Sequence, residues 1–152
     1  MRRGPRPLEC VTIGDELLSG RTVDTNAAAL GRSVEEVGWR VVRRVTVGDD
    51  AAAIEDAVRS ALERTGAVVC TGGLGPTRDD VTKAAVARVF GRPLRFDEEM
   101  WAALVARWRA MTREVPESNR TQAEVPAGAE VFPNPRGTAP GLGWWTTPAG
   151  SA

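Results

Sequence analysis

Residues 67–82 read AVVCTGGLGPTRDDVT, a short apolar run that leads into a glycine-rich turn and then into a helix. The run Ala67–Cys70 is continuous in its hydrophobicity, as in a strand of a parallel sheet that is covered on both faces. Three glycines follow it, and the segment from Val81 to Phe90 has the apolar spacing of a helix. We therefore predict a buried strand, a turn that needs positive φ angles, and a helix.

The same order of strand and helix precedes this stretch. Leu8–Ile13 and Trp39–Val47 are rich in apolar and β-branched residues and are predicted strands. A helix is expected from Thr25, which we take as its cap, and a second helix begins near Asp50 and ends before Gly66. This alternation predicts an α/β fold with a mostly parallel sheet, right-handed crossovers and helices on both faces.

The pattern changes after Pro93. Asp97 is expected to cap a helix. One face of this helix is apolar and is expected to lie in the core or in a subunit interface; it is formed by Trp101, Leu104, Val105, Trp108 and Met111. Ala129–Phe132 is a further predicted strand. We expect a single domain over residues 8–152, preceded by a disordered basic tail over residues 1–7.

The composition limits the partners of the chain. Twenty Lys and Arg balance twenty Asp and Glu, so we expect neither nucleic acid nor a membrane as a partner. The chain has no histidine, which excludes a Ser-His-Asp triad and the usual zinc sites. Cys10 and Cys70 both lie in apolar runs, and we predict free thiols in a cytoplasmic protein.

The turn after Cys70 is the strongest candidate for a binding site. Its residues Gly72, Gly73, Leu74 and Gly75 allow successive N–H groups to point at one anion, and the start of the following helix adds its positive dipole end. The spacing matches neither a Walker A motif nor a dinucleotide fingerprint. The turn therefore predicts a phosphate site, with Thr77 as a further contact.

Two carboxylates, Asp79 and Asp80, follow this turn and would repel a phosphate unless a cation lay between them. Mg²⁺ takes ligands from one or two carboxylates and from substrate phosphates, so we expect Asp80 to bind Mg²⁺ or another divalent cation. The alternative is that one of the two aspartates only caps the helix.

Three further stretches of the chain contain candidate residues. At the end of the first strand, Asp15 is a candidate metal ligand and Glu16 a candidate base, although a solvated turn is the alternative. Asn26 is either part of a helix start or a contact for ligand hydroxyls. In the last glycine-rich turn, Gly137 and the Thr138 hydroxyl are expected to bind the ligand, the alternative being a plain loop.

At these residues the chain resembles the amino-terminal domain of the CinA (competence/damage-inducible protein) family. The resemblance runs in order from about Leu8 to Gly141 and rests on four motifs: GDELLSG at 14–20, TGGLGPTRDDVT at 71–82, NRTQA at 119–123 and NPRGTAPG at 134–141. Family members continue after the last motif into another strand, so we expect this domain to be incomplete after Gly143.

The resemblance implies the fold, the activity and the roles of several residues. It implies the three-layer α/β/α fold of molybdopterin-binding proteins such as MogA and MoaB, and metal-dependent hydrolysis of ADP-ribose to AMP and ribose 5-phosphate. Asp80 matches the aspartate near Mg²⁺ and Glu16 the adjoining acidic motif, with Asp79 as a further catalytic candidate.

Two other functions stay open. One is molybdopterin binding or adenylylation, and the other is a non-catalytic ligand-binding module or inactive fragment. In each case the partner is a phosphorylated small molecule, ADP-ribose or molybdopterin. The paired Trp144 and Trp145 also predict a homo-oligomer.

Overall fold

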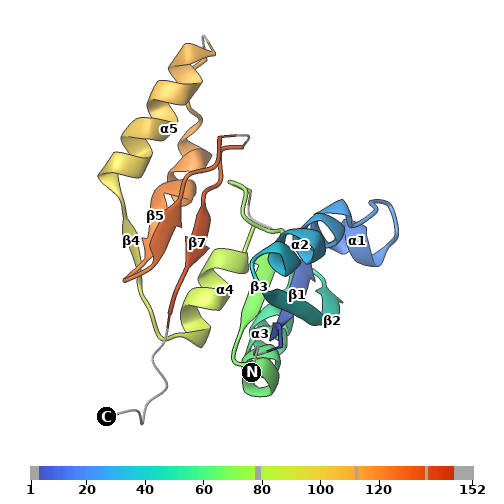
Figure 1. Ribbon diagram of the computed structural model, residues 1–152. Helices are drawn as coiled ribbons and strands as arrows, with labels where there is room; N and C mark the ends of the chain where they lie inside the picture. Colours follow the sequence, from blue (N-terminus) through green and yellow to red (C-terminus); the bar gives the residue numbers. More distant parts are fainter. Residues whose placement is uncertain (1–3, 78–79, 112, 136, 146–152) are drawn as a thin grey trace, which may run out of the picture. The chain divides into compact units, whose positions relative to one another are not determined.

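The computed structural model describes residues 4–77, 80–111, 113–135 and 137–145 (Figure 1). Contacts divide the chain into two compact units, and each is described by itself. The first unit comprises residues 1–74 and 78–91, and the second comprises residues 75–77 and 92–152. The single domain predicted above stays a prediction. In the described part of the chain, no helix has both the length and the apolar character needed to cross a bilayer.

The first unit is an α/β layer structure, as predicted. Its elements, in chain order, are β1 (Arg6–Ile13), α1 (Asp15–Leu18), α2 (Thr25–Glu36), β2 (Trp39–Val47), α3 (Ala51–Thr65), β3 (Val68–Thr71) and α4 (Thr82–Val89). The sheet is parallel with the order β2-β1-β3. β1 begins two residues earlier than expected, because Arg6 pairs with Trp39 and its guanidinium lies 4.3 Å from that ring.

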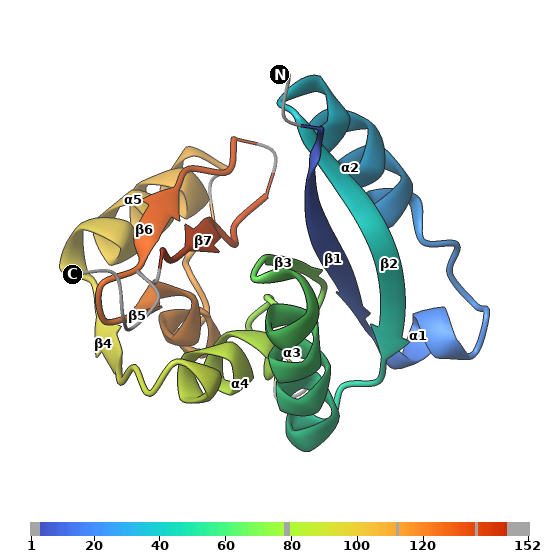
Figure 2. The same cartoon turned by 60° about the horizontal axis from the view of Figure 1, so that its bottom comes forward.

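The strand order explains why the centre of the sheet is covered on both faces. The chain moves from β1 to β2 in one direction and then back past β1 to β3, so right-handed crossovers place α2 and α3 on opposite faces. Figure 2 shows these two helices on opposite sides of the sheet. Residues 8–13 of β1 are accordingly all buried. The α3 residues Ile54, Val58 and Ala61 complete this core.

The helix boundaries follow local capping chemistry. Asp50 accepts a hydrogen bond from the Ala53 amide and starts α3, and Gly66, in the left-handed conformation, ends it, as predicted. The start of α2 was predicted wrongly: its N-cap is Asp24, whose Oδ1 accepts from the Ala27 amide at 2.9 Å, and not Thr25.

The second unit contains one long helix and short antiparallel strands. Its elements are β4 (Leu94–Phe96), α5 (Glu98–Ala110), the 3₁₀ helix η1 (Glu117–Ala123), β5 (Glu124–Pro126), β6 (Glu130–Phe132) and β7 (Gly141–Gly143). β4 pairs with β5, and β6 pairs with β7. Asp97 caps α5 as predicted, by accepting from the Met100 amide at 2.9 Å. Of the predicted apolar stripe, Leu104 in α5 is buried, whereas Met111, which follows the helix, is exposed.

Candidate functional site

The predicted phosphate turn lies at the carboxyl end of β3, directly after Thr71. Gly72 has φ +101° and Gly73 has φ +61°, conformations that favour glycine. A side chain at Gly72 would collide with the carbonyl oxygen of Ile13, and one at Gly73 would collide with the Thr82 hydroxyl. Both glycines are therefore required, because the turn packs directly against β1 and against the start of α4.

The end of β1 brings Glu16 to the same edge of the sheet. Thr12 pairs with Thr71, so β1 and β3 end side by side, and Gly14 follows β1 as Gly72 follows β3. The Glu16 carboxylate folds back over Gly14 and lies 2.6 Å from the place that a Cβ would occupy there. The exposed side chain of Glu16 thus stands at the strand end next to the glycine turn.

Asp15 has a different environment from the one we predicted for a metal ligand beside Asp80. Its backbone N–H donates to Asp49 Oδ2 at 3.0 Å, and its Oδ1 accepts from the Asp49 N–H at 3.3 Å. This reciprocal pair ties the end of β1 to the end of β2, which lies on the side of β1 away from β3. Among the described residues, no three acidic or cysteine side chains gather into a metal cluster. The role of Asp15 as a metal ligand stays a prediction.

The start of α4 contains an unsatisfied polar group that the sequence did not single out. Thr82 is 3% exposed, and its hydroxyl has no hydrogen-bond partner among the described residues. Its backbone N–H donates to Gly73 O at 3.3 Å, so the helix start is fastened to the glycine turn. The N-cap is Val81, which has no capping side chain, and the partly buried Asp80 precedes it. Arg78 and the predicted catalytic Asp79 lie outside the described residues.

The remaining candidates are distributed between the two units. In the first unit, Leu74 is the last residue of this stretch of the glycine turn, and Asn26 is exposed in the first turn of α2. Gly75, Thr77, Gly137 and Thr138 belong to the second unit. The structure thus brings Glu16 to the strand end beside the Gly72–Gly73 turn.

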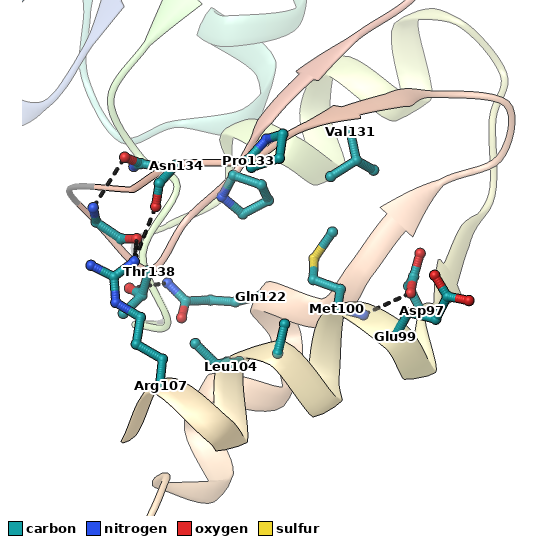
Figure 3. A pocket seen from close by; sticks show the side chains of 13 residues that line it. Asp97, Glu99, Met100, Leu104, Arg107, Gln122, Val131, Pro133, Asn134 and Thr138 are labelled. Carbon is teal, nitrogen blue, oxygen red and sulfur yellow. Dashed lines mark hydrogen bonds between the residues drawn. The ribbon is translucent and has the colours of Figure 1, made fainter. Parts of the chain in front are cut away.

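The second unit has a pocket of about 330 Å³ between α5 and the segments 133–134 and 137–140 (Figure 3). Thr138 lies at one end of this pocket together with Arg107 and Gln122, and Gly137, whose carbonyl accepts from Arg107, also lines the pocket. The Gly137 amide does not point at a ligand as predicted for a backbone nest, because it donates to Asn134 Oδ1 at 3.0 Å. The Thr138 hydroxyl accepts a hydrogen bond from Gln122 Nε2 at 3.1 Å.

Two pocket residues, Arg107 and Gln122, had no predicted role. Gln122 belongs to the NRTQA motif, and this motif is the sequence signal that could have pointed to it. Its side chain is 3% exposed and therefore needs hydrogen-bond partners within the protein. Arg107 is one of several arginines on a solvated helix. No local pattern distinguishes it, because its partners come 27 to 30 residues later.

Comparison with known proteins identifies the relatives of the chain. The model of a family described as probable molybdopterin binding domain matches residues 9–147, across both units. A CinA-like protein of Gemmatimonas aurantiaca is 56% identical over 138 residues, which make up 89% of this chain and 32% of that protein. A CinA-like protein of Frankia casuarinae is 45% identical over 139 residues. The chain spans about a third of the length of these curated relatives.

Two solved structures have a similar fold. The crystal structure of CinA from Thermoplasma acidophilum, described as a protein with unknown function, has a TM-score of 0.80 and 38% identity, and covers 91% of this chain and 80% of its own. The tungsten cofactor synthesizing protein MoaB from Pyrococcus furiosus has a TM-score of 0.55 and 25% identity over 72% of this chain and 69% of its own. These likenesses confirm the predicted α/β fold with a parallel sheet.

Proposed function

Because the chain belongs to the family of probable molybdopterin binding domains, and within it to the CinA-like proteins, we propose that it hydrolyses ADP-ribose to AMP and ribose 5-phosphate with the aid of Mg²⁺. The observation that carries this proposal is the turn at Gly72 and Gly73, which is held against β1 and α4 beside an unsatisfied Thr82 hydroxyl. Such a turn at a helix start supplies backbone donors and a positive dipole end for a phosphate.

The chemistry of the Asp80 carboxylate fits a divalent cation. Asp80 precedes the start of α4, and together with phosphate oxygens it would supply the hard oxygen ligands that Mg²⁺ prefers. When bound, Mg²⁺ reduces the negative charge of a pyrophosphate and makes it more susceptible to attack by water. The donor set of this turn is therefore suited to a nucleotide with two phosphates.

The chain's own residues would then bind and orient the reactants. The backbone of Gly72 and Gly73 would hold a phosphate, and the exposed Glu16 carboxylate at the adjacent strand end would accept a proton from the attacking water. The water oxygen forms a bond to the phosphorus on the terminal ribose, which becomes the phosphorus of ribose 5-phosphate. The bond from this phosphorus to the bridging oxygen breaks, and AMP leaves with the bridging oxygen. Asn26 is an expected further contact of the nucleotide.

The test is incubation of the protein with ADP-ribose and MgCl₂, with chromatographic detection of AMP and ribose 5-phosphate. We expect equal amounts of both products from the unmodified chain, and a loss of at least about a hundredfold in rate for Asp80→Asn. Asp56→Asn is the matched control, since Asp56 is exposed on α3, and it should keep full activity. If the chain is folded but forms no AMP, the proposed pyrophosphatase activity is refuted.

A second candidate is a pterin-binding module without hydrolytic activity, and the likeness to the MoaB of Pyrococcus furiosus favours it. Both candidates use the glycine turn for a phosphate, but only one cleaves a phosphoanhydride. Calorimetric titration with molybdopterin and with ADP-ribose separates them. Tight binding of molybdopterin, without turnover of ADP-ribose, would support the second candidate.

A further inference from the structure

One arginine fastens the turn that carries Thr138. Arg107 Nη1 donates to the carbonyl oxygens of Asn134, at 3.0 Å, and Gly137 (Figure 3). Its Nη2 donates to the carbonyl oxygen of Pro135 at 3.3 Å. The Asn134 side chain adds two bonds within the turn, from the Gly137 amide and to the Ala139 carbonyl. These backbone groups are therefore occupied by the protein itself, and the shape of the turn is set before any ligand binds.

A chain of buried amides determines the direction of the hydrogen bond at Thr138. Asn119 Nδ2 donates to Gln122 Oε1 at 3.0 Å, and both residues are 3% exposed. Because this bond occupies the Gln122 carbonyl oxygen, the Gln122 side chain faces Thr138 with its NH₂ group, which donates at 3.1 Å. The Thr138 oxygen is thus an acceptor toward Gln122, and its own proton has no acceptor within the described part of the chain.

The surroundings make this hydroxyl a suitable donor to an anion. Arg107 has only carbonyl partners among the described residues, so its positive charge is not cancelled by a carboxylate at this end of the pocket. The carboxylates of Asp97 and Glu99 lie at the far end (Figure 3). Apolar side chains such as Leu104 and Pro133 line the space between and strengthen a hydrogen bond formed there.

We infer that Gln122 and Arg107 are positioning residues, which together hold the Thr138 hydroxyl as a hydrogen-bond donor to an anionic oxygen of the ligand. This inference rests on the proposed function for the class of its ligand, a phosphorylated small molecule, and it concerns the pocket of the second unit by itself. Gln122 fixes which way the hydroxyl points, and Arg107 fixes the backbone that carries it. Both residues therefore act on the ligand through Thr138.

Gln122→Glu tests the inference, because it changes the direction of one hydrogen bond with almost no change of shape. A carboxylate still accepts from Asn119, but it can only accept from Thr138, so the hydroxyl proton turns away from the ligand. We expect Gln122→Glu to weaken the binding of ADP-ribose roughly tenfold in calorimetry, as does Thr138→Val, while Thr138→Ser, which keeps the hydroxyl, should weaken it less than Thr138→Val. Arg107→Lys, which keeps the charge but not the three bonds, should also weaken binding.

The double variant identifies the route of the effect. If Gln122 acts through Thr138, adding Gln122→Glu to Thr138→Val changes the dissociation constant by less than about twofold. A tenfold loss in both backgrounds would overturn the inference. So would unchanged binding in Thr138→Val, which alters a pocket side chain outside the core and serves as the deciding variant if Gln122→Glu fails to fold.

Inorganic phosphate, titrated in parallel, distinguishes this inference from the proposed function. Binding of phosphate with the expected variant pattern, but no binding of ADP-ribose, would refute the proposed substrate and support the role of Thr138. Binding of ADP-ribose that none of the variants weakens would support the proposed substrate and refute the role of Thr138. If the unmodified chain binds neither probe, both proposals are wrong.

Discussion

The Arg64 guanidinium donates two hydrogen bonds to the Glu9 carboxylate, from Nε to Oε1 at 2.7 Å and from Nη2 to Oε2 at 2.8 Å. Glu9 belongs to the central strand β1 and is 2% exposed, whereas Arg64 lies in the last turn of α3. The bond therefore fastens the end of a helix to the middle of the sheet. It also satisfies a buried charge, which would otherwise be costly in the core of the first unit.

This pair predicts how stability depends on pH. The hydrogen bond from Arg64 holds the pKa of the Glu9 carboxyl below its ordinary value, so the folded state binds the Glu9 proton less readily than the unfolded chain. The contribution to stability is complete above the unfolded pKa of about 4.3 and is lost as the pH falls through the lower folded pKa. We expect urea unfolding to show a smaller loss of stability between pH 5 and pH 3 in Glu9→Gln than in the unmodified chain. An equal loss would show that other carboxylates control the acid transition.

The glycine turn predicts an unusually large cost for a small substitution. Gly72→Ala places a Cβ against the Ile13 carbonyl at a φ of +101°, so we expect the unfolding free energy to fall by about 1–3 kcal/mol. Gly31→Ala is the matched control, since Gly31 lies inside α2 with open space around it, and it should raise stability by about 0.5–1 kcal/mol. Urea denaturation measures both changes, and similar values for the two variants would contradict the packing described here.

The start of α2 yields a prediction that distinguishes two adjacent residues. Asp24→Ala removes the acceptor of the Ala27 amide and should destabilise the chain by about 1 kcal/mol, whereas Thr25→Ala should change stability by less than about 0.5 kcal/mol. Thermal and chemical unfolding of the two variants gives the comparison. A larger loss of stability in Thr25→Ala than in Asp24→Ala would show that Thr25 is the N-cap, as the sequence suggested.

The environments of Cys10 and Cys70 predict that both thiols react slowly in the folded chain. Burial raises the pKa of the Cys70 thiol to about 12 and also raises the pKa of Cys10, which is fully buried. Neither thiol should react with an aromatic disulfide reagent at pH 8 until the chain unfolds. Stability should fall as the pH rises above about 8.5, because the unfolded thiols lose their protons there first. Rapid native labelling of Cys70 would contradict this environment.

The candidate site was predicted in part from the sequence. The motif after β3 predicted the glycine turn correctly, because positive φ angles and close backbone approach leave a direct mark on residue choice. The partner of Asp15 was not predictable, since Asp49 is 34 residues away and comes near only through the strand order. The same applies to Arg107, whose hydrogen bonds reach a turn with no complementary pattern.

The sequence by itself determined the succession of strands and helices in the first unit, because apolar spacing, capping aspartates and glycine stops act within a few residues of one another. Trp39–Val47 was predicted to the residue for this reason. Only the tertiary structure decided which polar side chains meet: Glu9 with Arg64 across 55 residues, and Gln122 with Thr138 across 16. Hydrogen bonds are satisfied by whichever group folding brings within about 3 Å, and no local pattern contains that information.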